Sequence, residues 1–342
     1  MKFKILSATL LFTSLITRVS AWDYEGHRAV NLLALDSLPT NFPAFVRTPE
    51  ARERIAFLGG ELDRWRNVKD LATSQYSGPD HYLDIEELAH YGLQPADLTP
   101  FRYDFIGRLA IARAAAPEKF PAPDPAKNED HTRELPGLLP WALAEYYGKL
   151  KSGFAYLKAY QEFGGTPEEI QNAQANIIAV MGTMGHLAGD AAQPLHTTVH
   201  HHGWVGANPH GYPTNSSFHQ WIDGGFFAKA GGVDAAKLRE KLRPAKVLAD
   251  TGKGVEVFAA IVPFIVAQNG KVEPLYQLEK ERKLSPGPEA TEGRAFLEGQ
   301  LIAGGQLLGD LWLSAWQNAP EDKYLKGRLT ARKVAAELNP LK

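Results

Sequence analysis

The stretch GHLAGDAAQPLH, residues 185–196, places two histidines and an aspartate close together in the chain. His186 and Asp190 are four residues apart, and side chains with this spacing lie on the same face of an α-helix. Pro194 interrupts such a helix, and His196 follows it. The imidazole and the carboxylate could share one metal ion, and the second oxygen of Asp190 could reach another ion. The alternative is an ordinary hydrogen-bonded pair of structural side chains.

The same spacing recurs in FHQWID, where His219 and Asp223 are four residues apart. Taken alone, this pair also fits an amphipathic helix with a surface ion pair. Two His/Asp pairs together with His196 form a set of nitrogen and oxygen donors that zinc accepts in catalytic sites. The recurrence therefore favours a metal site over two unrelated structural pairs.

The first 21 residues have the pattern of a secretory signal. Lys2 and Lys4 precede the apolar run ILSATLLFTSLI, and the small residues of Val19-Ser20-Ala21 are typical of a cleavage site. Cleavage there would make Trp22 the first residue of a secreted or periplasmic protein.

A free amino group at Trp22 could itself bind metal. An α-amino group has a low enough pKa to give up its proton to a metal near neutral pH. Together with the carbonyl oxygen of Trp22 it could chelate an ion, and His27, five residues later in AWDYEGHRAV, could complete the site. The alternative is a disordered terminus with a histidine that opens a helix. Asp63 in LDRWRN and His81 in DHYLDIE are further donors, each ordinary by itself.

Composition limits the possible functions. Removing Lys2, Lys4 and Arg18 with the signal leaves 34 Lys and Arg against 39 Asp and Glu, a formal charge of −5. This charge argues against a protein that binds long duplex DNA through a basic surface. It permits an enzyme whose positive charge comes from bound metal. The chain has no cysteine, which excludes thiolate ligands and disulfides.

The elements that would position these donors are helices. Apolar residues recur at spacings of three and four through most of the chain, and strand-like alternation is scarce. Thr166-Pro167-Glu168-Glu169 is a helix-start signal that leads into the helix ending before Pro194. We expect an all-α fold, a single mainly helical domain over 22–342 with the metal site in a cleft between helices. Residues 117–136, rich in Pro and charge, are expected to form an exposed loop or insertion.

These motifs, in this order, resemble the zinc-dependent secreted nucleases of the S-one/P-one type. The resemblance covers the span from Trp22 to Asp223 and, more loosely, the C-terminal helix, and its most specific part is GHLAGDAAQPLH. These nucleases share a superfamily with the zinc-dependent bacterial phospholipases C. Asp223, where the phospholipases typically have Glu, and the wide gap between His196 and His219 are nuclease-like.

The resemblance implies three zinc ions in each chain. One would bind Asp63, His81, His186 and Asp190. A second would bind the Trp22 amino and carbonyl groups, His27 and the other oxygen of Asp190, and a third would bind His196, His219 and Asp223. The residues beside His81 would hold a base, with Tyr82 stacking on it and Asp84 making a polar contact.

The implied reaction is hydrolysis of single-stranded DNA or RNA to 5′-phosphate products by a monomeric endonuclease. Zinc would supply a hydroxide that attacks the phosphodiester, with Asp63 and Asp190 as the catalytic carboxylates. A single-stranded substrate suits an acidic protein, because stacking can replace a basic groove. The alternatives are a phospholipase C acting on a phospholipid headgroup and a non-catalytic secreted zinc-binding protein. No stable membrane insertion is expected, and the apolar run FAAIVPFIVAQ is interpreted as core.

Three features depart from the nuclease pattern. The step of 105 residues from His81 to His186 is long and contains the Pro-rich stretch, the disulfides of eukaryotic members are absent, and no Asp-x-Gly-Gly-Asn string follows His196. The neighbouring His200, His201 and His202 are expected to form a solvated cluster in a loop, with metal or phosphate contact as the alternative.

Overall fold

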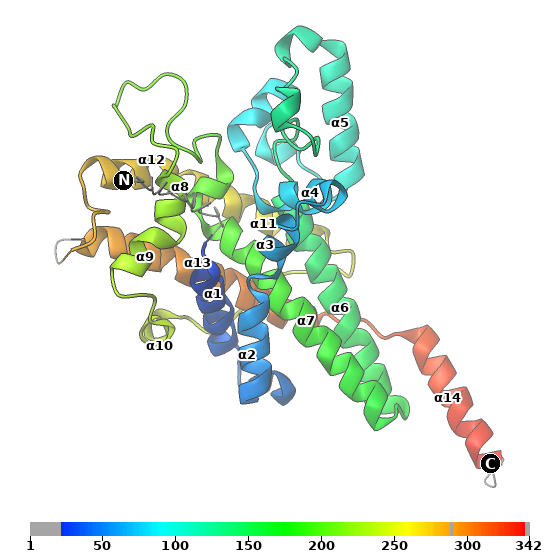
Figure 1. The fold of residues 1–342 in the computed structure, drawn as a ribbon. Helices are drawn as coiled ribbons and strands as arrows, with labels where there is room; N and C mark the ends of the chain where they lie inside the picture. The colour runs from blue at the N-terminus through cyan, green and yellow to red at the C-terminus, as the bar shows by residue number, and fades with distance from the viewer. Residues whose placement is uncertain (1–21, 288–289, 339–342) are drawn as a thin grey trace, which may run out of the picture.

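The expected all-α fold is confirmed by a computed structural model, which describes residues 22–287 and 290–338 (Figure 1). The described residues contain no β-strand, and only an isolated bridge pairs Leu83 with Gly137. The predicted signal segment, residues 1–21, lies outside the described residues. The helices are α1 (Tyr24–Ser37), α2 (Pro49–Leu58), α3 (Glu61–Arg66), α4 (Leu71–Ser77), α5 (Arg102–Ala115), α6 (Leu139–Phe163), α7 (Pro167–Ala192), α8 (Phe218–Gln220), α9 (Phe226–Lys229), α10 (Ala235–Leu238), α11 (Val255–Asn269), α12 (Val272–Lys280), α13 (Thr291–Gln317) and α14 (Lys323–Leu338).

Helix α7 is the centre of the fold, and it begins and ends where the sequence predicts. The Thr166 side chain accepts a hydrogen bond from the backbone N–H of Glu169, and the Glu169 carboxylate accepts one from the N–H of Thr166. The helix ends at Ala192, just before Pro194. All residues from Met181 to Ala192 are buried, because α1, α2, α6 and α13 pack around this half of the helix (Figure 1).

Glycines on one face of α7 let α1 and α2 come close. A Cβ atom on Gly185 would lie 1.6 Å from the Oδ1 atom of Asn31, and one on Gly182 would lie 2.6 Å from the Cβ of Leu58. Asn31 is fully buried and uses this proximity to donate hydrogen bonds to the carbonyl oxygens of Ile55 and Gly182, at 2.7 and 3.0 Å. The close approach brings His27 on α1 up to the histidine and aspartate of α7.

The helical pattern of residues 48–68 is divided between two helices. α2 ends at Leu58, and α3 begins at Glu61 after Gly59 and Gly60. A Cβ atom on Gly60 would lie 2.8 Å from the Tyr24 ring, so a larger residue would not fit there. The break turns α3 so that Asp63 is buried near α7.

Residues 117–136, named here the insertion segment, lie in the part of the molecule that includes α5 and projects from the helical body (Figure 1). Short 3₁₀ turns at Pro117–Lys119 and Pro125–Lys127 interrupt it, and residues 117–127 are mainly exposed. Its C-terminal end is buried at Pro136. The segment is therefore anchored at that end.

The apolar run FAAIVPFIVAQ forms part of α11. Val257, Ile261 and Ile265 are buried on the side that packs against α6 and α7. Among the described residues, one helical stretch, 255–280, is long and apolar enough by length and composition to cross a membrane. It is divided at Gly270 and Lys271 into α11 and α12. The final helix, α14, extends away from the body, and Leu329 is its one buried described residue (Figure 1).

Candidate metal centre

Three groups of histidine and aspartate side chains could each hold a metal ion. Within each group the candidate ligand atoms all lie within 4.8 Å of one another, and every member is buried. The groups are His27, His186 and Asp190; Asp63, His81 and His186; and His196, His219 and Asp223. Eight of the nine predicted ligand residues are therefore gathered in one place from distant parts of the chain.

The carboxylate of Asp190 lies at the middle of the centre. Its Oδ2 atom is 3.0 Å from the Nδ1 of His81 and 3.4 Å from the Nε2 of His186. Its Oδ1 atom is 3.6 Å from the Nε2 of His27 and 3.7 Å from the Nδ1 of His196. Four imidazoles from four segments thus surround one fully buried carboxylate, whose two oxygens face different histidines. This arrangement suits a carboxylate that bridges two cations.

Backbone carbonyl groups fix the orientation of two of these imidazoles. The Nδ1 of His186 donates to the carbonyl oxygen of Gly59 at 2.6 Å, and the Nδ1 of His196 donates to that of His81 at 2.6 Å. With Nδ1 occupied, the Nε2 lone pair of each ring is available for a metal. The glycine break between α2 and α3 supplies the first of these acceptors.

Several contacts in the centre require a cation or proton between them. The Nε2 atoms of His196 and His219 are 3.0 Å apart, and the Nε2 of His186 is 3.0 Å from the Nδ1 of His81. Two nitrogen lone pairs at this distance repel each other unless a positive charge lies between them. Buried atoms without a hydrogen-bond partner among the described residues include both ring nitrogens of His27, the Oδ1 of Asp190 and the Oδ2 of Asp223. Because buried polar atoms are normally satisfied, this donor set fits metal ions.

Burial keeps most of the imidazoles neutral, which is the form that binds metal. It lowers the pKa of His81 to about 4 and the pKa of His27 and His219 well below the usual value. At His186 burial also lowers the pKa, but the nearby carboxylates of Asp190 and Asp63 outweigh burial and raise it. The raised pKa favours a proton on His186, and a bound metal would take the place of that proton.

The pKa values of the two aspartates Asp190 and Asp223 are shifted in opposite directions. Burial raises the pKa of Asp190, but the neighbouring imidazoles of His196 and His186 outweigh it and hold the pKa well below its usual value. Burial raises the pKa of Asp223 well above its usual value, because the donated hydrogen bond from Gln193 compensates only in part. A cation at the group of His196, His219 and Asp223 would stabilise the ionised form of Asp223.

Two side chains that support the ligands were missed in the sequence. Gln193 is fully buried and donates from Nε2 to the Oδ1 of Asp223 at 2.7 Å, while its Oε1 accepts from the N–H of Leu195 at 2.7 Å. Arg66 donates to the Oδ1 of Asp63 at 2.7 Å. The available signals were the place of Gln193 beside Pro194 and the spacing of three between Asp63 and Arg66 on a helix.

Trp22 is fully buried beside the centre. Its indole N–H donates to the carbonyl oxygen of Gly189 at 3.0 Å, and the backbone N–H of Asp23 donates to the carbonyl oxygen of Asp223 at 3.0 Å. These contacts place the start of the described chain beside Asp223 and beside Gly189, the residue that precedes Asp190. Binding of metal by the Trp22 amino and carbonyl groups stays a prediction.

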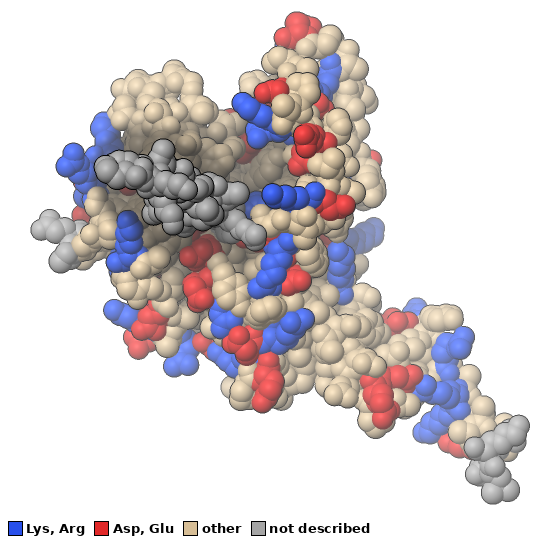
Figure 2. All heavy atoms as spheres, in the orientation of Figure 1, with Lys and Arg blue, Asp and Glu red and all other residues tan. Residues whose placement is uncertain are grey.

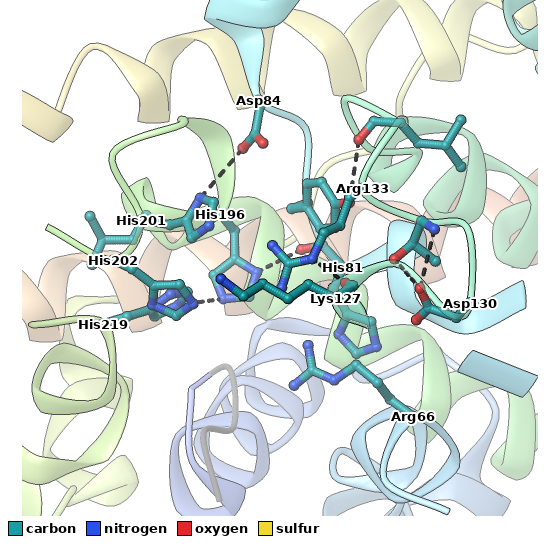
Figure 3. Close-up of a pocket in the computed structure, with 14 residues that line it drawn as sticks. Arg66, His81, Asp84, Lys127, Asp130, Arg133, His196, His201, His202 and His219 are labelled. Carbon is teal, nitrogen blue, oxygen red and sulfur yellow. Dashed lines mark hydrogen bonds and ion pairs between the residues drawn. The ribbon is translucent and has the colours of Figure 1, made fainter. Parts of the chain in front are cut away.

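A pocket of about 410 Å³ opens beside the metal centre, with His81, His196 and His219 in its lining (Figure 3). Tyr82 and Asp84, the predicted contacts for a base, also line it. The hydroxyl of Tyr82 donates to the carbonyl oxygen of Leu135 at 3.3 Å. Burial, together with the nearby Glu86 and Glu87, raises the pKa of Asp84 to about 8. A protonated Asp84 can donate a hydrogen bond as well as accept one.

The histidines at 200–202 lie in a loop, where His202 is exposed and the other two are partly exposed, and His201 and His202 also line the pocket. The Nδ1 of His201 lies 3.8 Å from the Oδ1 of Asp84, and the ring centroid of His202 lies 5.4 Å from that of His219. His200 instead stacks on Trp204, with centroids 3.9 Å apart. The loop turns at Gly203, where the backbone has a φ of +96° and no room for a Cβ. Position in sequence gave no sign of this turn.

No protein-family model matches this chain, and no curated protein matches it. The arrangement of side chains in the centre and its pocket must therefore carry any conclusion about function.

Proposed function

We propose that this protein is a secreted or periplasmic zinc-dependent nuclease that hydrolyses single-stranded DNA or RNA to 5′-phosphate products as a monomer. The observation that carries the proposal is the fully buried Asp190 carboxylate, which is surrounded by four imidazoles from separate segments. The donors are histidine and aspartate only, which suits zinc in a catalytic site. Zinc bound there would lower the pKa of a water molecule and would polarise a phosphoryl oxygen of the substrate.

The side chains around the centre suit a single strand. Tyr82 and Asp84 offer a ring and a polar group for a base, within the same pocket as His81 and His196. The cationic side chains of Arg66, Lys127 and Arg133 line this pocket as well. Figure 2 shows Lys and Arg interspersed with Asp and Glu on the face drawn, without a continuous basic strip on its described residues. A protein of this kind would hold a strand by local stacking and a few phosphate contacts.

The test compares substrates on one preparation of the protein. We expect rapid cleavage of a single-stranded oligonucleotide, slower cleavage of the same sequence as a duplex, and products that carry 5′-phosphates. Removal of metal with a chelator should abolish cleavage, and added zinc should restore it. The same preparation is assayed on phosphatidylcholine vesicles.

The outcomes separate the alternatives. Release of the phospholipid headgroup with intact polynucleotide would contradict the proposal in favour of a phospholipase C. Uptake of zinc without hydrolysis of either substrate would indicate a non-catalytic zinc-binding protein.

A further inference from the structure

The insertion segment builds one wall of the pocket at the metal centre. Its residues Lys127, Asp130, Thr132, Arg133 and Leu135 line the pocket. Figure 3 shows the side chains of Lys127 and Arg133 extending over the pocket on the side of His81 and His196. An exposed, polar segment of the sequence therefore contributes cationic groups next to the place where a substrate phosphate would lie.

Backbone contacts attach this wall to the strand-like stretch that carries the predicted base contacts. The N–H of Asp84 donates to the carbonyl oxygen of Pro136 at 2.6 Å, and the N–H of Leu139 donates to that of Tyr82 at 3.2 Å. Gly137 allows the approach, because its φ is +105° and a Cβ there would lie 2.0 Å from the carbonyl oxygen of Tyr82. The wall is therefore held at a fixed position relative to His81.

Contacts within the segment hold Arg133 in place. Its backbone N–H donates to the Oδ1 of Asn128 at 3.0 Å, and its Nε donates to the carbonyl oxygen of Lys127 at 2.5 Å. Asn128 is buried although its neighbours are exposed. These bonds use the inner end of the guanidinium and leave its terminal nitrogens for the pocket.

Arg133 has no close acidic partner among the described residues, and Lys127 has only an exposed, long ion pair. Among the residues that the structure describes, no carboxylate lies within ion-pair distance of Arg133, and the Nζ of Lys127 is 3.8 Å from the exposed Asp124. Arg66 differs, because Asp63 already binds its guanidinium. In a protein with more acidic than basic residues, the unpaired guanidinium of Arg133 and the weakly paired ammonium of Lys127 over one pocket favour an anionic ligand. The planar fork of arginine matches a phosphate group in particular.

We propose that Lys127 and Arg133 bind a second phosphate, next to the one that is hydrolysed. The preferred substrate is then a strand with at least two successive phosphates, in place of a diester with a single phosphate. This inference rests on the proposed nuclease function and assigns the insertion segment to substrate selection.

The test uses thymidine nucleotides that differ in their number of phosphates. The dinucleotide TpT has one phosphate, and the trinucleotide TpTpT has two. We expect the wild-type protein to have a higher kcat/KM for TpTpT, and we expect R133A and K127A each to lower the ratio of the two kcat/KM values about tenfold. Arg133→Lys, which keeps the charge, should retain part of the ratio. The slope of log KM for a longer thymidine strand against log salt should fall by about 0.7 in each alanine variant.

Lys119→Ala is the matched control. Lys119 is an exposed cation on the same segment, but it does not line the pocket at the metal centre. It lines an adjoining hollow to which Arg133 also contributes. It should leave the ratio unchanged, which separates a local contact from the loss of net charge. Hydrolysis of both substrates by the wild type, with a ratio that R133A and K127A do not change, would overturn this inference and leave the proposed function standing. Cleavage of the longer thymidine strand with no preference for TpTpT over TpT would overturn this inference alone, and cleavage of none of the three substrates by the wild type would overturn both.

Discussion

Replacement of Asp190 by asparagine is expected to lower kcat/KM for a single-stranded oligonucleotide about 10³-fold. The side chain keeps its shape, but it loses the negative charge and one of the two oxygens that face different histidines. Bound metal supplies several kcal/mol of charge stabilisation, and each 1.36 kcal/mol changes the rate about tenfold. Steady-state kinetics together with elemental analysis of the purified variant would measure both the rate and the loss of metal.

Asp310→Asn is the control for a buried aspartate outside the centre. Asp310 is buried on α13, where Arg243 forms an ion pair with it at 2.5 Å. This variant should lose stability because Arg243 is left unpaired, and it should keep its metal content. Full metal content and wild-type rates in Asp190→Asn would show that Asp190 does not bridge the ions.

An added glycine immediately before Trp22 is expected to weaken binding of one metal ion by at least about tenfold and to lower activity in parallel. The extension converts the free amine, with a pKa of about 8, into an amide that cannot bind zinc through a nitrogen lone pair. The burial of Trp22 and the bond from Asp23 to the carbonyl oxygen of Asp223 leave the start of the chain next to the centre. Titration of zinc into the metal-free protein, followed by activity, would measure the change.

Trp22→Phe separates the amine from the side chain. It keeps a free amino group, and it loses the indole hydrogen bond to Gly189 and part of a buried ring. We expect its zinc titration to resemble that of the wild type more closely than that of the extended chain. Equal zinc titrations for the extended and the wild-type chains would show that the amino group is not a ligand.

The contacts that could be predicted from the sequence are those within one element. A spacing of four on a helix predicts that His186 and Asp190 meet, and their atoms are 3.4 Å apart. The same spacing brings His219 within 3.1 Å of Asp223, although Trp221–Gly225 is a wider π-helical turn. The end of α7 before Pro194 followed from the missing N–H of proline and its effect on the preceding residues.

Contacts between elements could not be predicted in this way. The four imidazoles around Asp190 meet because glycines such as Gly182 and Gly185 let α1 and α2 approach α7. The sequence does not show which residue packs against a given glycine. The wall formed by the insertion segment depends on backbone bonds to Tyr82 and Asp84, which leave no pattern in residue type. The resemblance to a known family supplied the grouping of ligands that spacing alone left open.

The number of metal ions bound to the purified protein, measured together with its N-terminal residue, tests the proposed centre most directly. Elemental analysis should find about three zinc ions in each chain, and sequencing should show Trp22 as the first residue. A chain that holds a single metal ion, or one that begins at another residue, would contradict a centre in which three ions are gathered around Asp190.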